Sequence, residues 1–198
     1  MSTQKRLNTN LSILAECAVM LALSFALSCA KLFEMPMGGS VTIASMLPIM
    51  LVSIKYGVGT GLATAFAYSL TQLLQAVASP NVFPYCQTGE AVAICVLFDY
   101  VVPFTILGLA GIFHKMKLTK NTEMNIYIGI IGVVVLRFFC HFITGVTIWK
   151  QWTPEGMGKY LYSFLYNAGF LSVDFIICIV SAVLMFRKAE LRKLVNID

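Results

Sequence analysis

The chain has 198 residues, of which 59% are hydrophobic and 12% are charged, and its formal net charge at pH 7 is +5. Because a typical soluble domain carries roughly 25% charged residues, this composition excludes an ordinary soluble protein. A helix that crosses a membrane needs about 20 mostly apolar residues. The composition therefore predicts an all-α integral membrane protein, a single compact domain over residues 1–198 that forms a bundle of about six transmembrane helices.

The apolar stretches give the positions of the expected spans in chain order. They cover about residues 11–32, 40–56, 58–78, 89–113, 124–148 and 160–186. A proline- and glycine-rich segment at 35–39 ends the first span, and Gly57 separates the second from the third. The first stretch is longer than the apolar region of a signal peptide, which has roughly 7–15 residues. We therefore expect it to remain in the protein as a transmembrane helix.

Basic residues lie mostly on one side of this arrangement. With the N-terminus inside, ten lysines and arginines fall on inside loops and tails, and three fall outside, at Lys31, Lys150 and Lys159. Because Lys and Arg in short loops mark the cytoplasmic side, we expect both termini to be cytoplasmic. This placement also explains the positive net charge without nucleic acid as a partner.

Small residues recur at every fourth position on two of the expected helices. Ala18, Ala22 and Ala26 form one row, and a second row runs from Gly57 to Ser69. Small side chains let helices approach each other closely in lipid. The spacing leaves two interpretations open, namely packing within this bundle and docking of a separate membrane protein.

Ionisable side chains inside the apolar spans are the strongest functional signal. A charge at the bilayer centre costs about 2.5–3.5 kcal/mol on insertion scales, so such residues face the bundle interior or a cavity and are functional by default. The chain has five: Glu16, Asp99, Arg137, His141 and Asp174. Glu16 lies near the cytoplasmic end, where it can reach the interface. Arg137 and Asp174 both fall near mid-membrane and are candidates to pair with each other in a structural role.

Polar and aromatic residues gather in the outer half of three spans. Asp99 is in the fourth span, His141 and Trp149 share one helix face of the fifth, and Tyr162 and Asn167 begin the sixth. A carboxylate beside aromatic rings suits a flat, cationic, hydrogen-bonding ligand, because aromatic faces attract cations by roughly 0.5–2 kcal/mol. The sequence thus predicts a ligand pocket near the outer surface.

Two simpler interpretations stay open at this point. Trp149 and Tyr162 also fit the belt of aromatic side chains found at membrane interfaces, although no belt explains a carboxylate at the depth of Asp99. Asp99 can also form an ion pair with Arg137 without any ligand.

No catalytic or cofactor motif accompanies these residues. The glycine-rich run at 57–61 follows no strand and precedes no GK[ST] sequence, so it is not a phosphate-binding loop. The motifs HExxH and GxSxG are absent. The six cysteines include no CxxC pair, and we expect neither a disulfide nor a metal site. We therefore expect no enzyme activity and no cofactor, and any active transport must draw its energy from a partner or an ion gradient.

Two segments of the sequence resemble a known family. They are RFFCHFITG at 137–145, continuing to Trp149, Tyr162 and Asn167, and DYVVP at 99–103, followed by GLAGIF at 108–113. Both are similar to the thiamine-specific substrate-binding (S) components, the ThiT family, of energy-coupling factor (ECF) vitamin transporters. The resemblance extends over nearly the whole chain.

The resemblance implies a function, a site and partners. It implies an importer subunit of the bacterial cell membrane that binds thiamine from outside with high affinity and has no catalytic chemistry of its own. The implied binding residues are Asp99, Tyr100, His141, Trp149, Tyr162, Asn167 and Tyr68. The face of Ala18, Ala22 and Ala26 would pack against a transmembrane scaffold subunit, and two cytoplasmic ATPases would drive uptake.

The chain also departs from the family pattern. The family acid is glutamate, and Asp99 is shorter by one methylene. The family has tryptophans near the first external loop and on the third helix, where Phe33, Tyr68 or Trp152 would substitute here. Three rival functions remain: an S component for another heterocyclic vitamin or a thiamine precursor, a membrane enzyme with Asp99 and His141 as acid and base, and a structural membrane subunit. Thiamine phosphates also remain possible ligands, although no cluster of outer arginines is present to receive a phosphate.

Overall fold

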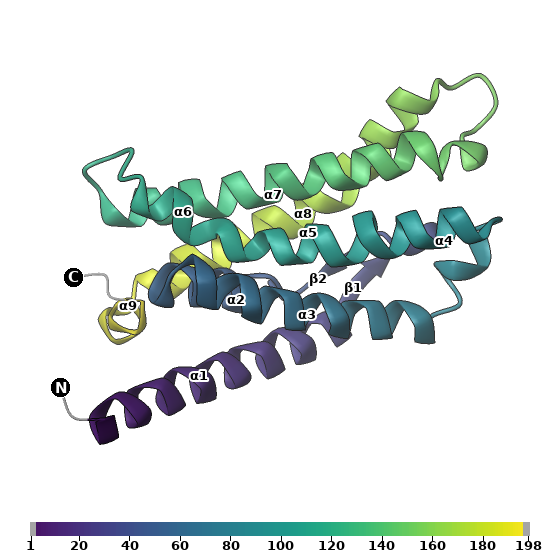
Figure 1. The fold of residues 1–198 in the computed structure, drawn as a ribbon. Coiled ribbons are helices and arrows are strands. Elements are labelled where there is room, and N and C mark those ends of the chain that lie inside the picture. Colours follow the sequence, from purple (N-terminus) through teal and green to yellow (C-terminus); the bar gives the residue numbers. More distant parts are fainter. Residues whose placement is uncertain (1–2, 196–198) are drawn as a thin grey trace.

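The computed structural model describes residues 3–195, and its elements are almost all helical. In chain order they are α1 (Thr3–Cys29), β1 (Lys31–Glu34), η1 (Pro36–Gly38), β2 (Ser40–Thr42), α2 (Leu47–Tyr56), α3 (Val58–Ala78), η2 (Phe83–Tyr85), α4 (Gly89–Cys95), η3 (Val96–Val101), α5 (Val102–Thr105), η4 (Ile106–Leu109), α6 (Ala110–Lys115), α7 (Thr122–Thr147), η5 (Lys150–Trp152), α8 (Lys159–Phe186) and α9 (Ala189–Leu194). The long helices run side by side, and α9 lies at the same end as the beginning of α1 (Figure 1).

Within the described residues, four helical stretches are long and apolar enough to cross a membrane. They are Thr9–Cys29, Gly89–Lys115, Thr122–Thr147 and Lys159–Phe186. The prediction of a helical, multi-pass membrane protein is thereby supported. The number of six spans and the cytoplasmic location of the termini stay predictions.

The second expected span differs from the structure at its beginning. Residues 40–42 form strand β2, which pairs antiparallel with β1, so that Glu34 lies opposite Ser40. Helix α2 begins only at Leu47 and has Pro48 in its first turn, where the missing N–H of proline costs nothing. The expectation of a helix from residue 40 was therefore wrong. The β-branched run from Val41 to Ile43 prefers an extended backbone.

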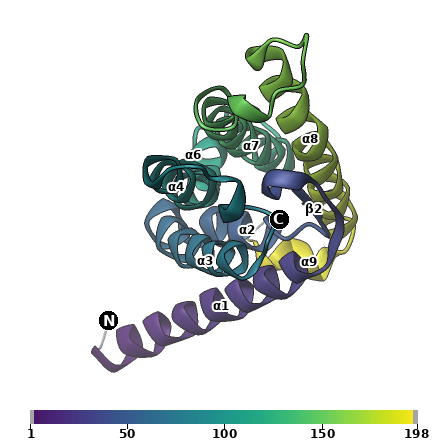
Figure 2. The ribbon, with the colours of Figure 1, turned by 90° about the vertical axis from the view of Figure 1, so that its right-hand side faces the viewer.

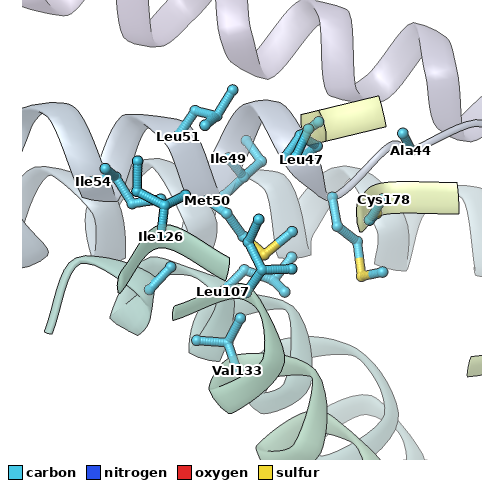
Figure 3. Packing of buried hydrophobic residues seen from close by; sticks show 14 of the residues in the cluster. Ala44, Leu47, Ile49, Met50, Leu51, Ile54, Leu107, Ile126, Val133 and Cys178 are labelled. Atoms are coloured by element: carbon cyan, nitrogen blue, oxygen red, sulfur yellow. The ribbon is translucent and has the colours of Figure 1, made fainter. Parts of the chain in front are cut away.

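Helix α2 lies inside the bundle. Every residue from Leu47 to Ile54 is buried, and the ten residues of this helix span about 15 Å, roughly half of the hydrocarbon core. Met50 of α2 lies next to Leu107 of η4, and Val133 of α7 belongs to the same buried cluster (Figure 3). A helix that is buried all round needs no polar face, which explains why α2 reads as a continuous apolar stretch.

The fourth span is a broken helix. Elements α4 to α6 follow one another without a loop, but Val96–Val101 forms a π-helical turn and Ile106–Leu109 a 3₁₀ turn. Pro103 has no N–H to donate to the carbonyl of Asp99, four residues earlier, so the regular hydrogen-bond ladder cannot continue there. The widened turn contains Asp99.

The two rows of small residues have different environments. Ala65 and Ser69 of α3 are fully buried, and a Cβ at Gly61 would lie 2.4 Å from Ser53 of α2, so this row packs inside the bundle. Ala18, Ala22 and Ala26 are all exposed on α1, which diverges from the other helices (Figure 1). The first row therefore does not serve packing within the described chain.

Helix α1 is fixed to the bundle by polar contacts. Lys55 of α2 donates to Glu16 at 2.6 Å, and the Lys55 ammonium also lies 4.9 Å from the ring centre of Tyr56. The interpretation of Glu16 as a residue that merely reaches the interface is incomplete, since its carboxylate joins two helices.

Candidate functional site

A cavity opens at the end of the bundle opposite α9. Helices α3, α4, α7 and α8 stand around this end, and the β1–β2 hairpin runs between α1 and α8 (Figure 2). The empty space is ≈ 910 Å³, counted out to the open end. Its lining includes Ser28, Lys31, Glu34, Gln72, Gln75, Asp99, Tyr100, Phe104, Arg137, His141, Thr144, Trp149, Tyr162, Ser163, Tyr166, Asn167 and Phe170.

The Asp99 carboxylate accepts hydrogen bonds from three side chains of one neighbouring segment. His141 Nδ1 lies 3.0 Å from Oδ1, and the Thr144 hydroxyl donates to the same oxygen. Trp149 Nε1 donates to Oδ2 at 2.9 Å. A carboxylate has about four acceptor positions, so these three donors of the described residues leave one acceptor position on Oδ2. The predicted grouping of Asp99 with His141 and Trp149 is present in the structure.

The tautomer of His141 follows from its second neighbour. Arg137 Nε lies 3.2 Å from His141 Nε2. Since a guanidinium can only donate, His141 Nε2 must accept, and the ring proton must be on Nδ1. His141 is thus a neutral imidazole that donates to Asp99.

Arg137 is buried without a direct carboxylate partner. No ion pair within residues 3–195 joins it to Asp99 or to Asp174. Its guanidinium carbon lies 4.2 Å from the ring centre of Phe104, and it also donates to the sulfur of Met46. Neither of the two ion pairs that the sequence left possible for Arg137 is present among these residues. Arg137 is connected to Asp99 instead through the two hydrogen bonds of the His141 ring.

Asp174 belongs to another polar group. Its Oδ1 accepts from the backbone N–H and the hydroxyl of Thr42, each at 3.0 Å. The acid therefore fixes the end of β2 to α8, which is a structural role.

The remaining predicted residues divide into two groups. Tyr100, Tyr162 and Asn167 line the cavity together with Asp99. The Asn167 amide also bridges two helices, because it donates to Ser163 O at 2.8 Å and to His141 O at 3.1 Å. It thereby reaches the site in spite of its five-residue separation from Tyr162.

Tyr68 lies behind the cavity wall. It is fully buried, and its ring meets the edge of Phe104 at 5.6 Å. Among the described residues, neither Tyr68, Phe33 nor Trp152 belongs to the cavity lining. Trp152 lies against Tyr85 instead, at 5.3 Å between ring centres. The aromatic surface of the site comes from Tyr100, Phe104, Trp149, Tyr162, Tyr166 and Phe170.

Comparison with known families decides what this site belongs to. The family model "Thiamine transporter protein (Thia_YuaJ)" matches residues 14–194. The chain belongs to this thiamine transporter family. The predicted family relationship is confirmed, and the chain is a transport protein rather than an enzyme.

Individual relatives agree with this assignment. The chain is 33% identical over 185 residues to the thiamine transporter ThiT of Bacillus subtilis (strain 168), which covers 89% of this chain and 91% of that protein. It is 24% identical over 132 residues to ThiT of Lacticaseibacillus paracasei, which covers 63% of this chain and 62% of the relative. A solved structure of ThiT from Listeria monocytogenes has the same fold, with a TM-score of 0.71 at 21% identity over 92% of this chain and 98% of that one.

Several lining residues of this family member were missed in the sequence. Thr144 is one helical turn after His141, so its spacing places it on the same face as His141. Gln72 and Gln75 lie within the apolar helix α3. An uncharged polar side chain in an apolar helix also indicates a site inside the bundle, but less strongly than a charged side chain does.

The hairpin adds a charged pair at the cavity. Lys31 donates to Glu34 at 2.8 Å, and both side chains line the opening. This hydrogen bond from the Lys31 ammonium holds the pKa of the Glu34 carboxyl below its ordinary value. Glu34 therefore stays ionised at neutral pH.

Tyr166 holds the hairpin turn onto α8. Its hydroxyl accepts from the Gly39 N–H at 3.1 Å and donates to the Pro36 carbonyl. Replacement of Tyr166 by phenylalanine removes both bonds and leaves the ring in place. We expect the Gly39 amide to exchange with deuterium about 2- to 10-fold faster, since a net hydrogen bond contributes about 0.5–1.5 kcal/mol. Tyr160→Phe, at an exposed position of α8, serves as the control, and unchanged Gly39 exchange in Tyr166→Phe would contradict this role.

Proposed function

We propose that this chain is the substrate-binding S component of an ECF-type importer and that it binds thiamine with high affinity in the cavity around Asp99. The free acceptor position of the Asp99 carboxylate carries the proposal. Thiamine joins an aminopyrimidine, which can donate an N–H to that oxygen, to a cationic thiazolium ring. The aromatic lining of Tyr100, Trp149 and Tyr162 suits both rings, because aromatic faces attract cations.

The orientation of the cavity supports uptake from outside. The cavity lies at the end of the bundle opposite α9, whose end of the molecule carries most of the basic loop residues. By the positive-inside rule, the cavity faces the exterior of a bacterial cell, and both termini are cytoplasmic.

We propose that other subunits supply the energy for uptake. The resemblance to S components implies a transmembrane scaffold subunit and two cytoplasmic ATPases, and the given sequence contains no phosphate-binding loop. The exposed alanine row of α1, formed by Ala18, Ala22 and Ala26, is the proposed docking face for that scaffold.

Titration calorimetry on the detergent-purified protein tests the ligand. We expect thiamine to bind tightly and oxythiamine, in which an oxo group replaces the amino group, to bind about 5–150-fold more weakly. The oxo oxygen would face the Asp99 carboxylate without a proton to share, which costs about 1–3 kcal/mol. Riboflavin, biotin and the isolated aminopyrimidine are the comparison ligands. If the folded protein does not bind thiamine but binds one of these ligands, that ligand replaces thiamine as the proposed substrate.

A further inference from the structure

The cavity has a second polar wall that the Asp99 group does not explain. It is formed by Ser28 near the end of α1 and by Gln72 and Gln75 near the end of α3. Gln72 Nε2 and Gln75 Nε2 lie 2.9 Å and 2.7 Å from the same atom, Ser28 Oγ. Because two side-chain amides contact one buried hydroxyl, the donor and the acceptor of each hydrogen bond can be assigned.

The Ser28 hydroxyl decides the direction of both amides. Ser28 Oγ lies 2.7 Å from the carbonyl oxygen of Phe25 and donates its single proton there. It can then only accept from the two glutamines. Both amide NH₂ groups must therefore point at Ser28, and both amide carbonyl oxygens must point away from it. This resolves the usual ambiguity between the nitrogen and the oxygen of a glutamine amide.

The two carbonyl oxygens are available to a ligand. Within residues 3–195, neither Gln72 Oε1 nor Gln75 Oε1 accepts a hydrogen bond, and neither atom is among the sealed, unpartnered polar atoms. Both residues line the cavity, as does the ionised carboxylate of Glu34. This wall thus presents two carbonyl acceptors beside the Lys31–Glu34 pair, whose opposite charges offset each other.

We propose that Gln72 and Gln75 form an acceptor site for the free hydroxyl group of the ligand and thereby select the alcohol over its phosphate esters. The inference rests on the proposed function, because it assigns the second end of the thiamine molecule. A hydroxyl donates a proton to an amide carbonyl. A phosphate ester has oxygen acceptors and negative charge at the same place, so it meets two carbonyl oxygens without a proton to offer them.

The test compares two ligands on two proteins. One ligand is thiamine, and the other is the analogue with an ethyl group in place of the hydroxyethyl group. We expect the wild-type protein to prefer thiamine by about tenfold, and the Gln72→Leu/Gln75→Leu protein to bind both ligands equally. The loss should arise from a tenfold weaker affinity for thiamine, about 1.4 kcal/mol, with the affinity for the ethyl analogue unchanged. Gln151→Leu, outside the cavity, is the matched control and should retain the preference.

A gain of affinity provides the second readout. Gln75→Lys replaces an acceptor by a donor and adds a positive charge. We expect thiamine monophosphate to gain about tenfold relative to thiamine in this variant. The acceptor site is overturned if the double leucine variant still prefers thiamine over the ethyl analogue, or if its affinity falls equally for both ligands. In either case, thiamine binding by the wild type leaves the proposed function intact. Wild-type protein that does not bind thiamine overturns both.

Discussion

Replacing Asp99 by asparagine is expected to weaken thiamine binding by about 30–150-fold, which corresponds to about 2–3 kcal/mol. Three donors, from His141, Thr144 and Trp149, converge on this carboxylate. An asparagine has one carbonyl oxygen and one NH₂ group, so the NH₂ must face at least one of these donors. The substitution also removes the negative charge that the thiazolium cation and the nearby Arg137 guanidinium require. Calorimetric dissociation constants measure the effect.

Two further variants make the Asp99 result specific. Asp99→Glu keeps the charge on a side chain that is one methylene longer, so it should retain most of the affinity that asparagine loses. Glu90→Gln removes an exposed carboxylate from the first turn of the same helix and should leave the affinity unchanged. Thiamine binding by folded Asp99→Asn protein at the wild-type affinity would show that the carboxylate does not contact the ligand.

The second large effect concerns the stability of the bundle. A Cβ at Gly108 would lie 2.5 Å from the backbone N of Leu62 and 2.6 Å from the carbonyl carbon of Gly61. These are backbone atoms of α3, which cannot move as a flexible side chain can. We therefore expect Gly108→Ala to lower the free energy of unfolding by about 2–3 kcal/mol and to lower the Tm by about 5–10 °C.

Gly59→Ala is the matched control for this substitution. Among the described residues, no atom beyond its own helical turn lies within 4 Å of a Cβ built at Gly59 of α3. The extra methyl group should be neutral or slightly stabilising there, since alanine favours helix over glycine. Thermal unfolding in detergent distinguishes the two variants, and equal Tm values would mean that η4 and α3 can separate at no cost.

The predicted site residues at helical spacing could be identified because that spacing defines a face. His141 lies on α7 and Trp149 lies two residues beyond its end at Thr147, and both contact Asp99, a charge that no lipid-facing position tolerates. Their meeting in one hydrogen-bonded group also depends on how the fourth span packs against α7, which spacing alone does not give. Thr144 was available from the same spacing and was missed because its hydroxyl carries little cost in a membrane.

The partners of Arg137 could not be predicted in the same way. The sequence shows two acids at membrane depth, and charge alone favours pairing with either of them. In the structure the guanidinium lies over Phe104 and donates to His141. The contact with Phe104 depends on packing between helices far apart in sequence, and the hydrogen bond to His141 depends on the orientation of both side chains. No local sequence pattern predicts either contact.

The beginning of α2 shows a third kind of limit. An apolar stretch from residue 40 onward fits a span by composition, but composition does not distinguish a buried strand from a buried helix. The distinction lies in Pro48 and in the β-branched residues before it. Tyr68 was likewise placed on the correct helix, but it lies behind Phe104 rather than in the cavity lining. Helical spacing does not show whether the ring of another helix separates a side chain from the cavity.

The π-helical turn at Val96–Val101 also has an evolutionary consequence. Loss of a single codon there would remove the residue that widens the turn while Pro103 still interrupts the ladder, and it would leave the hydropathy of the segment and its insertion into the membrane almost unchanged. The residues before the deletion would rotate by about 100° relative to those after it, and the acid would leave the ring of donors around it. A lineage supplied with its own vitamin could thus lose binding in one step and still produce a well-folded membrane protein, so a descendant's hydropathy profile alone would not reveal that uptake had ended.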